Sequence, residues 1–225
     1  MYRMVQFIIP PAPKTAKARA GRPKDASKKA GIIRAASSLF MKDGFELTSM
    51  EAVAKKADVS KLTIYSHFAN KEELFKAIIH QRCDQQAMPE CFMALAHLPV
   101  EKALIDLGHR LTSLIFSPDS LRLQRVMQAE ATRHPQIIKI FFEAGPKRVR
   151  VAFGELLAEW VRQGKLRVDD IPVATEQYFS LIKGEMHQKA LMLLAPKPTA
   201  RELNKHIRAA VTLFLSGYQV KAGRS

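Results

Sequence analysis

The chain has 225 residues, of which 47% are hydrophobic and 25% are charged, as expected of a globular protein with one sizeable core or two smaller ones. Its 36 Lys and Arg residues outnumber its 21 Asp and Glu residues, so the formal net charge is +15. No apolar run approaches the roughly 20 residues that span a bilayer, and prolines cut off the short apolar run at residues 5–9 before it forms a signal-peptide core. We therefore expect a cytoplasmic protein without a membrane partner.

Positive charge is concentrated in the first third of the chain. Residues 1–82 contain 16 Lys and Arg against 7 Asp and Glu, whereas residues 83–225 contain 20 against 14. Proteins that neutralise nucleic-acid phosphates gain affinity from counterion release, so this asymmetry favours a nucleic-acid partner at the N-terminal end. Charge alone more often marks a solvated face, so it supports a DNA-binding motif without replacing one.

Residues 1–24 are rich in Pro, Ala and Lys and lack a helical or strand period, which predicts a disordered basic arm. Two interpretations of the arm are open. In the first, its last basic residues, Arg22 and Lys24, bind in an A·T-rich minor groove of DNA, where the negative potential is strong. In the second, the arm only keeps the protein in solution.

A first helix is predicted from Ser27 to about Asp43, because apolar residues recur at helical spacing and Gly44 follows as a left-handed cap. A second helix follows, with one apolar stripe made by Met50, Val53, Ala54 and Ala57. Thr48 and Glu51 are spaced as a capping box that begins this second helix.

A three-residue turn is predicted at Ala57-Asp58-Val59, and Ser60 then caps a third helix. Ile64, Tyr65 and Phe68 are expected to point inward. The outward positions carry side chains that suit base edges and phosphates. In this prediction Lys61, Thr63 and His67 contact bases or nearby phosphates, Ser66 contacts bases or backbone, and Leu62 touches a thymine methyl group. Thr48, Ser49, Tyr65 and Lys71 hold the DNA backbone and fix the register, and Ser60 is a further DNA-binding candidate.

From Arg22 to Arg82 the sequence resembles the DNA-binding domain of TetR-family transcriptional regulators. The resemblance is carried by Leu39-Phe40, Gly44-Phe45, Thr48-Ser49, Val53-Ala54, Ala57, Val59-Ser60, Tyr65, Phe68, Lys71 and Leu74. Two positions differ from the family pattern. Asp58 stands in the turn and Leu62 follows Lys61, where the family commonly has glycine. Asp tolerates a left-handed turn conformation better than most residues, whereas Leu62 affects only the base preference.

Asn70 and Glu73 predict the start of a fourth helix, and the pattern stays helical beyond residue 83. Helices are predicted near 99–117, 119–133, 136–163 with a break at Gly145-Pro146, 172–194 and 199–220, and prolines stand at their junctions. The prediction is an all-α fold with three parts: the arm at 1–24, a helix-turn-helix domain at 25–82 and an effector-binding and dimerisation domain at 83–225. The segment from Leu121 to Met192 also resembles the C-terminal domain of AefR-like members of the family.

The last two predicted helices are long and rich in apolar residues, and the family resemblance implies that such helices form a homodimer interface. The interface residues expected there are Phe179, Ile182, Met186, Ala190, Leu194, Ile207, Val211 and Phe214. A monomeric core is the alternative.

A small effector, apolar or amphipathic, is expected in the C-terminal part, because pockets in helical domains are mostly apolar with a few polar groups. The candidate residues are His109, Phe116, Met127, Glu130, Phe153, Trp160, Phe179, Met186 and His187. The alternatives are plain core packing for the apolar residues and a surface ion pair with Arg133 for Glu130.

The sequence therefore predicts a ligand-responsive, homodimeric repressor that binds a palindromic double-stranded DNA operator. No enzyme motif, cofactor site or closely spaced metal-ligand pair occurs. Two alternatives are open: a redox- or metal-responsive regulator that uses Cys83, Cys91 or the seven histidines, and a basic helical protein that binds acidic surfaces without sequence preference.

Overall fold

The computed structural model describes residues 23–220, which form an almost entirely helical protein. The helices are α1 (Pro23–Leu47), α2 (Met50–Lys56), α3 (Lys61–His67), α4 (Lys71–Gln86), a 3₁₀ helix (Pro89–His97), α5 (Val100–Ile115), α6 (Pro118–Glu130), α7 (Pro135–Phe142), a π-helical turn (Glu143–Lys147), α8 (Arg148–Arg162), α9 (Ile171–Leu191) and α10 (Ala200–Tyr218). The predicted all-α fold is confirmed. Within the described residues, the β structure is one isolated bridge between Leu166 and Gln219.

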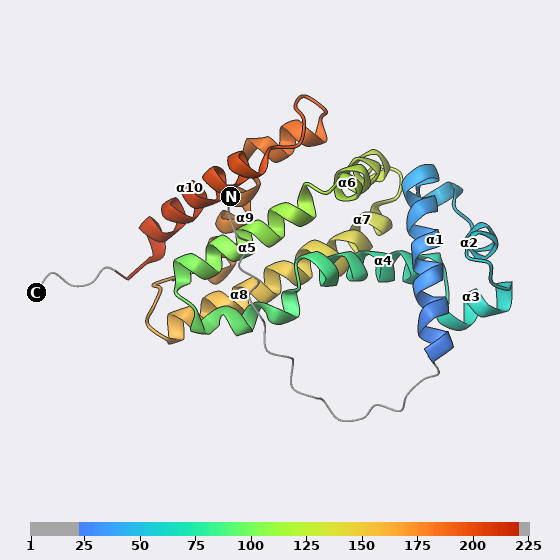
Figure 1. Cartoon of the computed structure of the whole chain (residues 1–225), viewed down its shortest axis with the longest axis horizontal. Helices are drawn as coiled ribbons and strands as arrows, with labels where there is room; N and C mark the ends of the chain where they lie inside the picture. Colours follow the sequence, from blue (N-terminus) through green and yellow to red (C-terminus); the bar gives the residue numbers. More distant parts are fainter. Residues whose placement is uncertain (1–22, 221–225) are drawn as a thin grey trace, which may run out of the picture.

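The short helices α2 and α3 lie at one end of the molecule, against α1, while α9 and α10 lie toward the other end (Figure 1). Helix α4 leaves the α1–α3 group and runs into the body of the protein beside α8 (Figure 1). Among residues 23–220, no helix is long and apolar enough to cross a membrane.

Two large hydrophobic clusters form the core, and α4 contributes to both. The first cluster joins α1–α4 to residues of α6 and α7, among them Leu123, Met127 and Ile137. The second joins α5, α8, α9 and α10 and includes Cys83 of α4. A movement of α4 would therefore change the packing of both clusters. The division at residues 82 and 83 stays a prediction, and it falls inside this shared helix.

The first helix begins earlier than the sequence predicted. Helix α1 starts at Pro23 rather than at Ser27, so the last two residues of the predicted arm are helical. Arg22 and the rest of the predicted arm lie outside the described residues, and the side chain of Lys24 is also not described. At Gly44 the backbone leaves helical geometry, with φ 78° and ψ 178°. Only φ has the sign expected of a left-handed cap, because ψ is extended.

The C-terminal helices end within a few residues of the predicted boundaries, apart from three differences. The predicted helix at 172–194 is interrupted at Gly184, where the backbone has φ 55° and ψ −176°. The sequence analysis missed the 3₁₀ helix at Pro89–His97, which is too short to show a clear period. The predicted break at Gly145-Pro146 is a π-helical turn, through which the helical path continues from α7 into α8. Proline lacks a backbone N–H group and its ring clashes with the carbonyl four residues before it in an α-helix, and the wider π turn gives this ring more room.

Candidate nucleic-acid interface and regulatory pocket

Helices α2 and α3 are joined by a tight turn at Ala57, Asp58 and Val59. The amide of Val59 donates to the carbonyl oxygen of Ala54 at 3.0 Å, and Asp58 has φ 53°. The positive φ is the conformation expected of the residue that replaces the family's glycine. Ser60 then begins α3, since its Oγ accepts a hydrogen bond from the amide of Thr63 at 3.1 Å. The sequence predicted both features of this turn.

The predicted capping box of α2 is wrong by one residue. Ser49, not Thr48, is the cap, and its Oγ accepts from the amide of Ala52 at 3.1 Å. Thr48 is 2% exposed and donates its hydroxyl to the carbonyl oxygen of Gly44 at 2.8 Å. Its side chain is thus used inside the domain, where it fixes the non-helical link between α1 and α2, and does not face the surface.

Glu51, the other half of the predicted box, pairs with a residue of α3 instead. Its Oε1 lies 2.6 Å from Nζ of Lys61. This ion pair is exposed and raises the pKa of Lys61 through the hydrogen bond to Glu51. An exposed pair of this kind adds little to stability, so Lys61 can exchange Glu51 for a phosphate at low energetic cost.

The outer face of α3 combines apolar and polar groups. Leu62 is 82% exposed, and Tyr65, which the sequence analysis placed inward, is 42% exposed. Ile64 and Phe68 are buried as predicted. Both side chains are therefore accessible to another molecule at the surface of α3.

The hydroxyl groups near the start of α3 form a local network. Oγ of Ser60 lies 2.8 Å from Oγ1 of Thr63, and Ser66 donates to the carbonyl oxygen of Thr63 at 2.8 Å. The network leaves acceptor lone pairs on these oxygens and orders the side chains that the sequence assigned to DNA.

Lys71 is tied to the loop after α1. Its Nζ donates to the carbonyl oxygens of Phe45 at 2.8 Å and Glu46 at 3.2 Å and lies 4.3 Å from the centroid of the Phe45 ring. Lys71 thus positions the α1–α2 link against α4 in addition to the DNA role predicted for it. The sequence analysis also missed Lys55 and Lys56, two exposed cations in the last turn of α2.

An apolar pocket lies where α4 meets the C-terminal helices, with an empty space of about 770 Å³ when its mouth is included. Of the nine predicted effector residues, only Phe179 lines this pocket. The lining residues are Ile79, Arg82, Cys83, Leu111, Leu114, Ile115, Ser120, Leu123, Gln124, Phe141, Gly145, Pro146, Val149, Arg150, Phe179, Ile182 and Lys183.

The other predicted effector residues lie elsewhere. Phe153 and Trp160 are fully buried in the C-terminal core, and Met127 is in the cluster with α1–α4. His187 packs edge-on against Phe116, with 5.5 Å between the ring centroids. Met186 packs against the small hydrophobic cluster that contains Phe116. His109 is exposed on α5, and Glu130 contacts His134 rather than the expected Arg133. Helical spacing identified apolar faces, but it does not distinguish a packed face from a hollow one.

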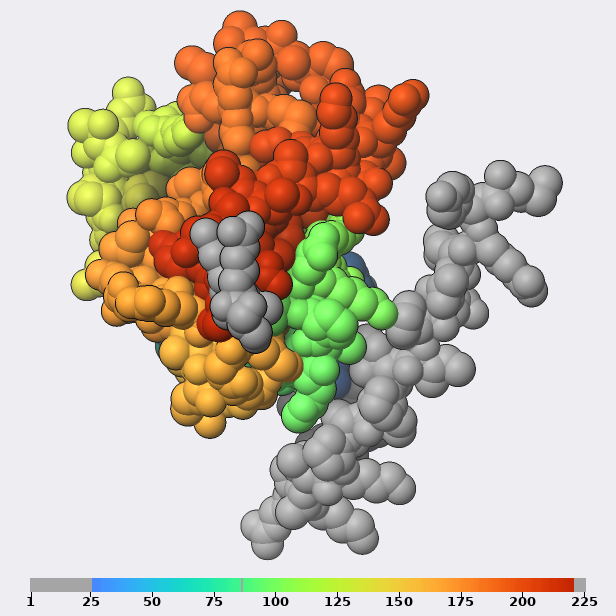
Figure 2. Space-filling view, turned by 90° about the vertical axis from the view of Figure 1, so that its left-hand side faces the viewer, coloured from blue at the N-terminus to red at the C-terminus, as the bar shows by residue number. Residues whose placement is uncertain are grey.

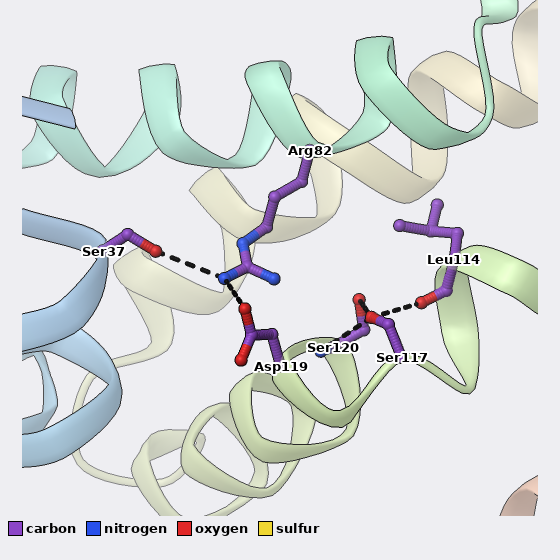
Figure 3. A network of polar contacts seen from close by, with 6 residues as sticks. All are labelled: Ser37, Arg82, Leu114, Ser117, Asp119 and Ser120. Carbon is purple, nitrogen blue, oxygen red and sulfur yellow. Dashed lines mark hydrogen bonds and ion pairs between the residues drawn. The ribbon is translucent and has the colours of Figure 1, made fainter. Parts of the chain in front are cut away.

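The pocket is linked to α1 by Arg82, which the sequence analysis did not select. Arg82 Nη2 donates to Ser37 Oγ at 3.2 Å and to Asp119 Oδ2 at 3.1 Å (Figure 3). One guanidinium therefore joins α4, α1 and α6 at the wall of the pocket. Next to this contact, Ser117 caps α6 by accepting from the amide of Ser120 at 3.2 Å (Figure 3).

Most of the predicted dimer-interface residues face the protomer's own core. Phe179, Ile182, Ala190, Ile207, Val211 and Phe214 are all buried in the single chain, and Met186 is partly buried. Leu194, which is 72% exposed, is the exception. The apolar stripe of an outer helix packs inward, so a contact with a second copy must use the opposite face.

The alternatives gain little support from the geometry. Burial raises the pKa of the Cys83 thiol to about 11, which is opposite to the low pKa of a reactive cysteine. Among the described residues, no group of three His, Cys, Asp or Glu side chains is arranged to hold a metal ion.

Comparison with known proteins decides the family. The model for bacterial regulatory proteins of the tetR family matches residues 32–78, and the model for the C-terminal domain of AefR-like transcriptional repressors matches residues 102–220. The chain belongs to the TetR family. It is a DNA-binding transcriptional regulator and not an enzyme, as the sequence predicted.

Relatives and solved structures agree with this assignment. The chain is 33% identical over 132 residues to the uncharacterised HTH-type transcriptional regulator YhgD of Bacillus subtilis, covering 52% of this chain and 68% of YhgD. A putative TetR-family regulator from Mesorhizobium loti superposes with a TM-score of 0.75 at 29% identity, covering 88% of this chain and 100% of the other. The flavonoid-responsive regulator FrrA superposes with a TM-score of 0.69 at 30% identity over the same shares.

Proposed function

We propose that this TetR-family protein is a homodimeric repressor that binds a palindromic operator through α3 and releases it when a small molecule enters the pocket beside α4. The observation that carries the proposal is the outer face of α3. It presents Lys61, Leu62, Tyr65 and Ser66 on a helix that Ile64 and Phe68 anchor to the core.

Each part of this face suits a part of duplex DNA. Lys61 supplies a cation for a phosphate or a guanine, and the methyl groups of Leu62 match the methyl group of thymine. Tyr65 and Ser66 offer hydroxyl groups to the backbone. A seven-residue helix reads only a few base pairs, so two copies at half-sites about 34–36 Å apart are needed for a useful specificity ratio.

The second copy is proposed to bind the outer face of α10, which we define by Lys205, Ala209, Thr212, Leu213 and Ser216. Helix α10 and part of α9 occupy the middle and upper part of the surface in Figure 2, at the end away from α1–α3. Leu213 is 59% exposed, and small residues beside it allow two helices to approach closely. Thr212 and Ser216 already donate to backbone carbonyls, at 2.9 and 2.7 Å, so their burial leaves no donor unsatisfied.

Ligand response is supported by the position of the pocket. Helix α4 lines it with Ile79, Arg82 and Cys83, while the first part of α4 is packed in the core of the DNA-binding end. A ligand that prefers one position of α4 therefore changes the spacing of the two α3 helices. The name of the neighbour FrrA, a flavonoid-responsive regulator, supports a small-molecule effector for this fold.

The test is selection of binding sites from random duplexes, followed by titration of the selected site and a scrambled site. We expect an inverted repeat to be selected. Tyr65→Ala is expected to weaken binding to every sequence by about tenfold, whereas Thr63→Ala changes the preferred base more than the overall affinity. Tyr65→Phe is the matched control, because it keeps the ring and removes only the hydroxyl. Equal affinity for selected and scrambled duplexes at all salt concentrations would refute the proposal.

The dimer is tested separately by Leu213→Arg, which places two charges opposite each other across the proposed interface. Light scattering is expected to give the mass of a dimer for the wild type and of a monomer for the variant. Lys189→Arg, on the exposed side of α9, is the control that keeps the dimer. A variant Leu213→Arg that stays dimeric would show that the subunits meet at another surface.

A further inference from the structure

The pocket beside α4 has an apolar wall and a charged wall. The apolar wall is supplied chiefly by Leu111 and Leu114 of α5, Val149 of α8 and Phe179 and Ile182 of α9. The charged wall is supplied by Arg150 and Lys183, from α8 and α9. A third cation of the lining, Arg82, is already paired with Asp119. All the lining residues belong to the described part of the chain, and none of them is Asp or Glu.

The two cations are held in place without a carboxylate. Arg150 donates through Nη1 to the carbonyl oxygen of Pro146 at 3.3 Å, and its guanidinium lies 5.0 Å from the centroid of the Phe179 ring. The side chain of Lys183 forms no hydrogen bond or ion pair with any residue that the structure describes. Both side chains are only partly exposed.

The surroundings disfavour the positive charges. Burial lowers the pKa of Lys183, and the charge of Arg150 lowers it further. Burial also lowers the pKa of Arg150, although the charge of Glu176 acts in the opposite direction. Two like charges that face one apolar space cost free energy, and an anion between them offsets this cost because its interaction is strong where water is excluded.

We propose that the pocket binds an amphipathic anion with one acidic group, whose acid lies between Lys183 and Arg150 and whose apolar part packs against Leu111, Leu114 and Phe179. The inference deepens the proposed function, on which its regulatory meaning rests, by naming the chemical class of the effector. The guanidinium of Arg150 matches a carboxylate through two parallel hydrogen bonds, and the flexible Lys183 closes over it.

The size of the pocket limits the apolar part. The cavity volume is about 100 Å³, and the empty space is about 770 Å³ when the open solvent at the mouth is included. For comparison, an apolar protein cavity of about 150 Å³ holds a benzene molecule. The present cavity is smaller than that, so a short alkyl chain fits inside, and a ring or a longer ligand extends into the open mouth.

The experiment uses three probes of one shape and different charge: octanoate, octanol and octylamine. Each is titrated by calorimetry into the full-length protein without DNA at pH 7.5. We expect octanoate to bind at least tenfold more tightly than octanol, with octylamine weakest. Equal affinities for octanoate and octanol would overturn the proposal, as would a failure of octanoate to bind.

Two variants of Lys183 test the location. Lys183→Met keeps the apolar stem and is expected to reduce octanoate affinity about tenfold, with octanol unchanged. Lys183→Glu is expected to favour octylamine over octanoate, which shows that the variant is folded and that the site is the one proposed. Lys189→Met, an exposed lysine of the same helix, is the control that leaves octanoate affinity unchanged. Octanoate binding that is unaffected by either variant of Lys183 would overturn the assignment.

Operator binding is measured separately, so that the two proposals fail separately. If the protein selects an inverted repeat but binds the three probes equally, the proposed operator binding is supported and the proposed anionic effector is refuted. A protein that prefers octanoate through Lys183 but does not release DNA supports the anion site and refutes the ligand-responsive part of the function.

Discussion

The protein carries positive charge in two contrasting environments. On α3, Lys61 stands in solvent and pairs with Glu51 across the turn, with both side chains more than half exposed. At the pocket, Lys183 and Arg150 are partly buried against apolar side chains, and burial lowers the pKa of both. The exposed cation on α3 suits DNA, a polyanion that releases bound counterions when it binds the protein. The partly buried cations of the pocket suit one small anion that loses its hydration water on binding.

The contrast shows that net charge alone does not identify a partner. The sequence places most of the excess charge before residue 83, and this excess explains attraction to DNA. The more specific signal comes from a pair of cations in the less basic part of the chain. Their environment, rather than their number, selects the ligand.

Salt concentration is expected to separate the two environments by the largest margin. Between 50 and 200 mM salt, operator affinity should fall by about 10³-fold, because phosphate contacts release condensed counterions. Octanoate affinity should change by only about two- to threefold, because a buried pair is poorly screened. Fluorescence anisotropy for the DNA and calorimetry for octanoate measure the two slopes on the same protein sample. Parallel slopes would show that the pocket cations are as solvated as those of α3.

Acid is expected to destabilise the C-terminal helices through His187 of α9. Burial, aided by the charge of Lys183, lowers the pKa of His187 to about 4 from 6.5. The folded state therefore binds fewer protons than the unfolded state between pH 6.5 and 4, so the free energy of unfolding falls as the pH decreases through this range. The loss is about 1.4 kcal/mol for each pH unit at most. Urea unfolding across this range measures it.

The matched variant is His187→Met. Nε2 of His187 is buried and has no hydrogen-bond partner among the described residues, so an apolar side chain of similar size removes a desolvated group without opening a cavity. The variant should be at least as stable as the wild type at pH 7 and lose less stability toward pH 4. Identical pH profiles for both proteins would place the acid sensitivity elsewhere.

The two halves meet where α4 crosses the π-helical turn, and Gly145 permits this crossing. A Cβ at Gly145 would lie 2.9 Å from Cγ2 of Ile79 and 3.3 Å from Sγ of Cys83. Gly145→Ala is therefore expected to destabilise the protein by about 1–3 kcal/mol in urea unfolding, because α4 must shift.

A second glycine serves as the control for the first. At Gly31 in α1, a Cβ would meet only the end of Arg34, at 3.9 Å. Gly31→Ala should stabilise the protein by about 0.5–1 kcal/mol, because alanine is the better helix former. If both substitutions had the same sign, the close packing of α4 on the π turn would be contradicted.

The sequence was a good guide where local chemistry determines structure. The turn at Asp58, the cap at Ser60 and the burial of Ile64 and Phe68 all follow from residue type and spacing. The shift of the α2 cap from Thr48 to Ser49 shows the limit of this approach. Both residues can cap a helix, and the choice depends on the carbonyl of Gly44, which takes the hydroxyl of Thr48.

The sequence was a poor guide to the pocket and the outer surface. Phe153, Trp160 and Val211 have the spacing of a functional face but lie in the core. What makes a pocket is the absence of a side chain between helices that are far apart in the sequence, and no local pattern records it. Arg150 and Lys183 were overlooked because charged residues at such positions usually stay in solvent, and only the packing of α8 and α9 brings them together.

A small effect on stability is expected at Arg82, which joins the pocket wall to α1. Arg82→Met removes its contacts with Ser37 and Asp119 and should cost only about 1 kcal/mol, since Asp119 is largely exposed. Its effect on regulation should be larger, because this guanidinium joins the pocket wall to α1. We expect octanoate to bind the variant but to lower its operator affinity less than it does for the wild type. Arg148→Met is the control, because Arg148 pairs with Asp84 and Glu90 and does not contact α1. If Arg82→Met responded to octanoate as fully as the control, the signal would pass from the pocket to α3 through the packed side chains of α4 alone.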